Sequence, residues 1–161
     1  LNIGGNGIMG YIEIPDILQG ITTSLDITHI LCDRTWVVFN DENIRIVLIF
    51  EKNGTLIISR KGIVSNGSWR YIKANSSILI NSSDIHFLLH PTFLDNVVFA
   101  LRQDGTENYL FMIDDKQLSI FTNLTLISLK HYCDSKALKA MEEQERIRLQ
   151  EEKEKFYTDT L

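Results

Sequence analysis

Histidine and cysteine side chains are the first candidates for chemistry in this sequence. His131 and Cys133 stand two positions apart, and a cysteine thiolate beside an imidazole base can act as a nucleophile when the fold adds an orienting group. His86 and His90 share one face if their segment is a strand, but they are then about 13 Å apart, too far for one metal ion. We therefore expect no metal site, and we interpret His131 and Cys133 as partly buried residues where a strand meets a helix.

Two cysteines are too few for a disulfide framework or a metal cluster. The separation of Cys32 and Cys133 along the chain does not forbid one bridge between them, so their pairing stays open. Two buried free thiols are the simpler expectation. A hydrolase that uses Cys133 or a loop acid is the weakest of the functions we consider, because no catalytic constellation can be assembled around either.

Acidic side chains gather in the expected turns, where they could collect a cation. Asp104 and Glu107 stand near one turn, and Asp114 and Asp115 follow the next apolar segment. Calcium takes six or more oxygen ligands at a tight bend, and the run Asp-Gly-Thr-Glu lacks the alternating acids that such a loop needs. No two of these acids stand out as a glycosidase pair. We interpret them as solvated turn residues.

The glycines at 5, 7 and 10 match the pattern G-x-G-x-x-G. Glycines in this array let backbone N–H groups approach a phosphate, provided that a strand precedes the motif and a helix follows it. Only four residues precede the motif, and Pro15 stands where the helix would run. We therefore predict a flexible leader here and no nucleotide or other cofactor.

Composition sets further limits on function. The 161 residues are 44% hydrophobic and 23% charged, and the net charge is −5. A nucleic-acid binder or a surface for anionic lipid normally needs a concentrated basic face, and no apolar run approaches the roughly 20 residues that span a bilayer. We expect neither a nucleic-acid partner nor membrane insertion. The compartment stays open, with the cytoplasm preferred.

Alternating apolar residues and regular turn signals dominate residues 35–122. Asn53-Gly54 and Asp104-Gly105 are strong hairpin signals, and eight or nine short strands follow one another with a turn about every ten residues. This pattern predicts an antiparallel meander that closes into a small barrel or half-barrel, or a sandwich. We also expect a break at Asn66-Gly67, a loop around Pro91 and a weak strand over 118–121.

The two flanks differ from this β domain. Residues 1–34 read as a glycine-rich leader with a short helix opened by Pro15 and Asp16, and residues 25–32 fit a helical turn or a strand equally well. Residues 123–161 read as a helix and charged linker that begins near Asn123 or Asp134. Pairs of opposite charge four residues apart support that helix, but no heptad seam is sustained. We expect this helix to be exposed to solvent and to link the β domain to a larger protein or assembly.

Four stretches carry a resemblance to a known family: Trp36, Phe50 to Thr55 (FEKNGT), Gly67 to Tyr71 (GSWRY) and Ile78 to Ile80 (ILI). Over Trp36 to Leu101 the chain resembles small bacterial lipocalin-like domains. That resemblance implies an up-and-down barrel that serves as a binding or accessory module. A pleckstrin-homology-like barrel is the alternative architecture. It too is a strand meander followed by a helix, but the chain lacks the dense basic cluster that binds phosphoinositides.

Aromatic residues of the β domain would converge if the meander closes, either as a filled core, which small barrels favour, or as the wall of an apolar pocket. These candidate ligand-binding residues are Trp36, Trp69, Tyr71, Phe87, Phe99, Tyr109 and Phe111. Because several strands are apolar on both faces and no catalytic constellation is present, we expect a non-enzymatic interaction or accessory domain. Its partner would be another protein or a further domain of the same chain. The alternative is a lipocalin-like carrier of a small apolar ligand.

Overall fold

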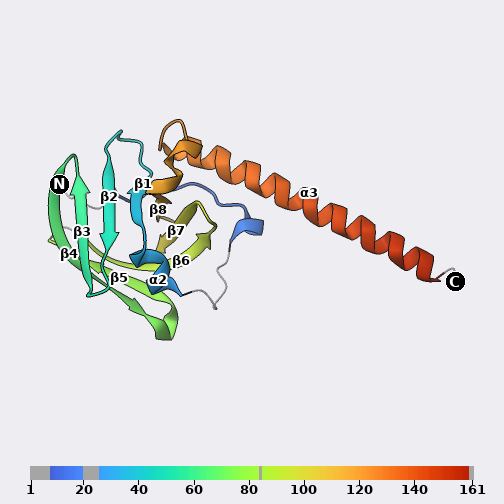
Figure 1. Ribbon diagram of the computed structural model, residues 1–161, viewed down its shortest axis with the longest axis horizontal. Coiled ribbons are helices and arrows are strands. Elements are labelled where there is room, and N and C mark those ends of the chain that lie inside the picture. The colour runs from blue at the N-terminus through green and yellow to red at the C-terminus, as the bar shows by residue number, and fades with distance from the viewer. Residues whose placement is uncertain (1–7, 20–25, 84, 160–161) are drawn as a thin grey trace.

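A computed structural model describes residues 8–19, 26–83 and 85–159, and it contains a closed barrel of eight antiparallel strands followed by a long helix (Figure 1). The expected fold class, an antiparallel meander closed into a barrel with a C-terminal helix, is confirmed. The strands follow one another around the barrel in chain order: β1 (Thr35–Val38), β2 (Ile46–Phe50), β3 (Thr55–Arg60), β4 (Ile63–Ile72), β5 (Ser77–Asn81), β6 (His86–Leu94), β7 (Val98–Gln103) and β8 (Tyr109–Asp114).

The first strand closes the barrel because it pairs on both sides. Trp36 lies opposite Leu48 of β2 and opposite Asp114 of β8. Side chains alternate between the two faces of a strand, so Trp36 and Val38 point into the barrel while Val37 points outward. This alternation gives β1 two buried faces.

The predicted hairpin at Asn53-Gly54 is present, and a glycine with positive φ also lies in the next hairpin turn. In the β2–β3 turn Gly54 has φ +93°, and the side chain of Asn53 accepts a hydrogen bond from the backbone N–H of Thr55 over 2.9 Å. In the β3–β4 turn Lys61 and Gly62 both have positive φ, 54° and 78°. Two consecutive positive φ angles are characteristic of the tight hairpin turn that suits the twist of antiparallel strands.

The predicted break at Asn66-Gly67 is wrong, because both residues lie inside β4, the longest strand. A Cβ atom on Gly67 would lie 2.3 Å from the backbone oxygen of Asn81 in β5. The glycine therefore permits a close approach of two strands and does not mark a turn.

Two more local predictions fail for identifiable reasons. Pro91 lies within β6 and not in a loop; the register with β7 shifts between Pro91 and Phe93, and such a bulge tolerates proline. Residues 115–120 form the 3-10 helix η3 (Asp115–Ile120) and not a weak strand. The side chain of Asp114 starts η3 by accepting a hydrogen bond from the backbone N–H of Lys116 over 3.0 Å.

Short helices precede the barrel and interrupt it. The predicted helix after Pro15 is present as η1 (Asp16–Leu18), and η2 (Lys73–Asn75) joins β4 to β5. The segment that fitted a helix or a strand equally well is helical, as α2 (Ile27–Cys32). The side chain of Asp26 caps α2 by accepting a hydrogen bond from the N–H of His29 over 3.1 Å.

Buried side chains form two clusters, one on each side of the barrel wall. The inner cluster fills the barrel and includes Ile27 and Leu31 of α2. The outer cluster lies between the outer face of β1, β7 and β8, the segment 10–14 through Ile12 and Ile14, and the start of the C-terminal helix. Within that segment Gly10 pairs with Tyr109 of β8 through two backbone hydrogen bonds of 2.8 and 2.7 Å. Of the glycine motif, Gly5 and Gly7 lie outside the described residues.

Helix α3 (Leu126–Asp159) has 34 residues, and it begins near the first of the two expected starts. The side chain of Thr125 accepts a hydrogen bond from the N–H of Ser128, and Asp41 of the β1–β2 loop accepts one from the N–H of Leu126. Leu129, Cys133 and Ala137 are its buried residues. After them the helix runs straight away from the barrel (Figure 1).

Candidate functional site

The barrel interior holds five of the seven aromatic residues that were expected to converge. Trp36, Trp69 and Phe99 are buried there, and Tyr71 and Phe87 pack against them partly exposed. Trp36 and Phe99 have their ring centres 5.8 Å apart. The expectation of convergence is correct for these five residues.

Both indole N–H groups of the interior are satisfied by backbone. The Nε1 atom of Trp36 donates to the carbonyl of Leu31 at the end of α2 over 3.2 Å. The Nε1 atom of Trp69 donates to the carbonyl of Glu51 in the β2–β3 turn over 2.8 Å. Each bond ties an interior ring to a segment near an end of a strand, and leaves no indole donor free for a ligand.

Five large side chains of the interior have no exposed surface. Trp36, Leu48, Phe50, Leu89 and Phe99 are each 0% exposed. A void large enough for water would expose part of the side chains around it, so the space around these five residues is filled. These side chains therefore leave no empty lumen around them for an apolar ligand.

The expectation of convergence is wrong for Tyr109 and Phe111. Both point outward from β8, where their rings stack with centres 5.1 Å apart in the outer cluster. Residues 109–113 of β8 are all apolar or aromatic and all buried, so no alternation of polar and apolar residues reveals which face of the strand is the inner one. From the sequence alone, Tyr109 could therefore be placed on either face of β8.

The outer cluster is covered by α3, and a polar group lies at the edge of that contact. The Oδ2 atom of Asp95, in the β6–β7 turn, accepts hydrogen bonds from the hydroxyl of Tyr132 and from Nζ of Lys136. Its Oδ1 atom accepts from the backbone N–H groups of Val97 and Val98 over 2.8 and 2.6 Å. Both carboxylate oxygens of Asp95 are thus used, one in the turn and one on the helix.

This arrangement perturbs the titration of the groups that take part. Burial opposes ionisation of Asp95, but Lys136, Tyr132 and the two backbone donors outweigh it and hold the pKa of the carboxyl below its ordinary value. Burial and the neighbouring carboxylate raise the pKa of Tyr132. Asp95 therefore stays a carboxylate and Tyr132 a neutral phenol around neutral pH, which suits a structural contact.

Cys133 and His131 do not form a nucleophile pair. Cys133 is 1% exposed, and burial raises the pKa of its thiol to about 12. His131 is exposed two residues earlier on the same helix, and so points away from the thiol. Cys32 and Cys133 are both free, and burial also raises the pKa of Cys32. Neither thiol is activated.

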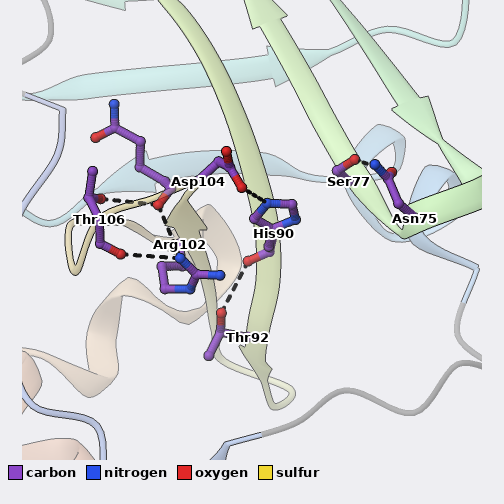
Figure 2. Close-up of polar contacts among 8 residues, drawn as sticks. Asn75, Ser77, His90, Thr92, Arg102, Asp104 and Thr106 are labelled. Atoms are coloured by element: carbon purple, nitrogen blue, oxygen red, sulfur yellow. Dashed lines mark hydrogen bonds and ion pairs between the residues drawn. The ribbon is translucent and has the colours of Figure 1, made fainter.

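A histidine–aspartate pair lies on the outside of the barrel. His90 of β6 and Asp104, at the end of β7, are joined over 2.7 Å between Nε2 and Oδ1 (Figure 2). Ser77 lies on the neighbouring strand, but it is fully buried and its hydroxyl donates to Asn75. The hydroxyl proton is therefore not directed at the imidazole, and the three residues do not form a charge-relay arrangement.

The remaining polar candidates stay separate. His86 contacts Asn81 over 3.1 Å and not His90. Asp115 pairs with Arg45, and Asp114 pairs with Arg34. In the part of the chain that the structure describes, no group of three or more histidine, cysteine or acidic side chains could hold a metal ion.

The free part of α3, residues 138–159, exposes apolar side chains that the barrel fold does not explain. Leu138, Met141, Leu149 and Phe156 are 51 to 64% exposed along it. Their neighbours form ion pairs within the helix, such as Glu143 with Arg146 over 2.5 Å. The sequence predicted a solvated charged helix here. Because these four apolar residues do not follow a heptad repeat, their placement around the helix was not recognised.

Comparison with known proteins finds no match to this chain among protein-family models, curated proteins or solved structures. Within residues 8–19, 26–83 and 85–159, no helix is both long enough and apolar enough to cross a membrane.

Proposed function

We propose that this chain is a non-enzymatic interaction module, in which the barrel is the base and the free part of α3 binds a partner protein or another part of the same chain. The observation that carries this proposal is the free part of α3 itself. It leaves the barrel after Ala137, and it exposes Leu138, Met141, Leu149 and Phe156. Removal of apolar surface from water is favourable by about 25 cal/mol per Å², from which the entropy lost on association is subtracted.

The way in which α3 is attached supports the proposal. Leu129, Cys133 and Ala137 fix its first turns to the barrel, and the carboxylate of Asp95 holds Tyr132 and Lys136. A helix anchored at one end keeps a fixed direction, so it presents its free part to a partner with little entropy left to lose.

A carrier of a small apolar ligand is the second candidate. The closed eight-stranded meander supports the proposed relationship to lipocalin-like domains, but the filled interior moves any ligand to the outer surface. A pocket of about 630 Å³ is open there between the segment 11–13 and the first turn of α3, with Tyr11, Ile12 and Ile127 among its apolar residues. This volume is within the range of small-molecule sites.

Site-specific photo-crosslinking separates the two candidates. A photoreactive amino acid replaces Met141 in the full-length chain, in the cells that produce it, and the matched control replaces Glu143 on another side of the same helix. We expect a defined protein adduct from position 141 and none from position 143. No adduct from position 141, together with a small molecule retained on the purified chain in native mass spectrometry, would overturn the interaction module in favour of the carrier.

A further inference from the structure

Four of the six large apolar side chains that are exposed in residues 138–159 lie on one side of the helix, whereas Ile147 and Tyr157 lie off that side. At 3.6 residues per turn, positions 138, 149 and 156 fall within about 20° of one line, and position 141 falls about 60° to one side. The buried residues Leu129 and Cys133, which face the barrel, point to the opposite side. We name the set of Leu138, Met141, Leu149 and Phe156 the outer stripe; their side chains are 56, 51, 52 and 64% exposed.

Two glutamates interrupt the outer stripe, and one arginine bridges them. Arg148 contacts Glu145 over 2.8 Å through Nε and Glu152 over 2.6 Å through Nη1. The stripe therefore does not present two unpaired acids. Residues 138–159 contain seven acidic and five basic side chains, so the charge that opposes association of two such helices is small.

The stripe has a spacing that complements itself in the antiparallel direction. Leu138 and Phe156 stand nine residues before and after Ile147, and Glu145 and Leu149 stand two residues before and after it. In an antiparallel pair centred at Ile147, Leu138 of one copy therefore meets Phe156 of the second copy, twice. Glu145 meets Leu149 of the second copy and does not face a second Glu145.

One pair of opposite charges beside the stripe favours the same arrangement. Glu142 and Lys153 are 11 residues apart, close to three full turns, so they lie on the same flank of the helix. A two-fold axis across the pair brings this flank of one copy against the same flank of the other. Glu142 then lies near Lys153 of the second copy, again twice. A parallel pair in register instead places Glu145 against Glu145 and Glu152 against Glu152, where like charges oppose each other.

We propose that the partner of α3 is a second copy of this chain, bound antiparallel through the outer stripe. The inference rests on the proposed function, because it names the partner for that surface. Because each barrel contacts the start of its own α3 and the two helices run in opposite directions, the two barrels lie at opposite ends of the pair. The free part of α3 has 22 residues, so the contact is roughly 33 Å long. Only four apolar side chains come from each copy, and we expect a dissociation constant in the micromolar range.

Sedimentation equilibrium of the purified full-length chain, from about 5 to 500 µM, tests self-association. We expect a reversible dimer, and we expect Leu149→Lys to weaken the dimer roughly tenfold or more. The matched control Gln150→Lys adds the same charge one position away, off the stripe, and should leave the dimer unchanged. A chain that stays monomeric throughout this range overturns the inference, as does equal weakening by both variants.

Disulfide trapping tests the direction, in a Cys32→Ser background that leaves only the buried Cys133. Leu138→Cys and Phe156→Cys proteins are prepared separately, mixed and oxidised. We expect the mixed disulfide between positions 138 and 156 to exceed either symmetric one; dominant 138–138 and 156–156 products would overturn the antiparallel pair. A purified monomer that still crosslinks from position 141 to a different protein overturns this inference and leaves the interaction module standing. A monomer with no adduct removes both.

Discussion

The hydroxyl of Tyr132 in α3 donates a hydrogen bond of 2.5 Å to the Oδ2 atom of Asp95, 37 residues earlier in the β6–β7 turn. Lys136, one helical turn after Tyr132, contacts the same oxygen over 2.7 Å. The side chain of Asp95 is 11% exposed, so this contact is shielded from water. A single carboxylate thus joins a turn of the barrel to the helix that leaves it.

Replacement of Asp95 by asparagine should destabilise the protein by about 1–3 kcal/mol, because Lys136 loses its counter-charge at a shielded site. The oxygen of asparagine can still accept the turn hydrogen bonds from Val97 and Val98, so the loss reports on the helix contact. Urea unfolding measures the change. Asp134→Asn, which breaks an exposed pair with Lys130, should change stability by less than about 0.5 kcal/mol.

The contribution of Asp95 should also depend on pH in a defined direction. Its pKa is lower in the folded chain than in the unfolded chain, so its stabilising effect is present above the ordinary aspartate pKa of about 4 and is lost as the pH falls through the folded value. Urea unfolding of the parent and of Asp95→Asn between pH 7 and pH 3 should show a difference that shrinks toward acid. A difference that stays constant or grows would contradict this assignment.

Gly67 and Gly62 should respond differently to alanine. At Gly67 the new Cβ atom would lie 2.3 Å from a backbone oxygen, and we expect a loss of about 2 kcal/mol or more because β4 and β5 must move apart. At Gly62 nothing lies within 4 Å, and the cost is the strain of a positive φ, about 1 kcal/mol. Thermal or urea unfolding of the two variants gives the ranking; equal losses would refute the close-approach explanation.

The filled interior predicts a high cost for any cavity. Leu48 is 0% exposed at the centre of β2, and Leu48→Ala should cost about 2–5 kcal/mol. Ile63, 75% exposed at the start of β4, is the control, and Ile63→Ala should change stability by less than about 0.5 kcal/mol. A Leu48→Ala variant as stable as the parent would mean that the barrel interior is not close-packed.

The two thiols should react at different rates with a thiol reagent at pH 8. Cys133 is 1% exposed with its pKa raised to about 12, so it should react only when the chain unfolds. Cys32 is partly exposed and should react first. Counting modified thiols over time, with and without urea, gives the result. Rapid reaction at both sites in the folded chain would place the α3 contact in doubt.

Much of the barrel could be predicted from the sequence because strand period and turn residues are local signals. The alternation around Leu48 and the Asn53-Gly54 turn identified β2, β3 and their hairpin correctly. Gly67 and Pro91 were misplaced because a glycine that admits a neighbouring backbone and a proline at a bulge carry the same local signal as turn residues. Only the pairing partner distinguishes the two cases, and that partner is distant in sequence.

The candidate site was less accessible for a similar reason. Trp69 could be assigned to the interior because Ser68 and Arg70 alternate with it in β4. The placement of Trp36 was correct although β1 is buried on both faces. Tyr109 and Phe111 could not be assigned, since β8 is buried on both faces by elements from opposite ends of the chain. The contact of Asp95 with Tyr132 could not be predicted either. Asp95 is an ordinary turn residue and Tyr132 an ordinary helix residue, so neither local sequence indicates that the two side chains meet.

Pairing of β1 with β8 has a consequence for how anything can attach to this fold. Each of the eight strands has a hydrogen-bonded neighbour on either side, so the addition of a foreign strand is limited to short stretches such as residues 63–67 of β4, which pair with β3 and not with β5. A mutation that separates β1 from β8 would expose two unpaired strand edges at once, and we expect the protein to aggregate as a result.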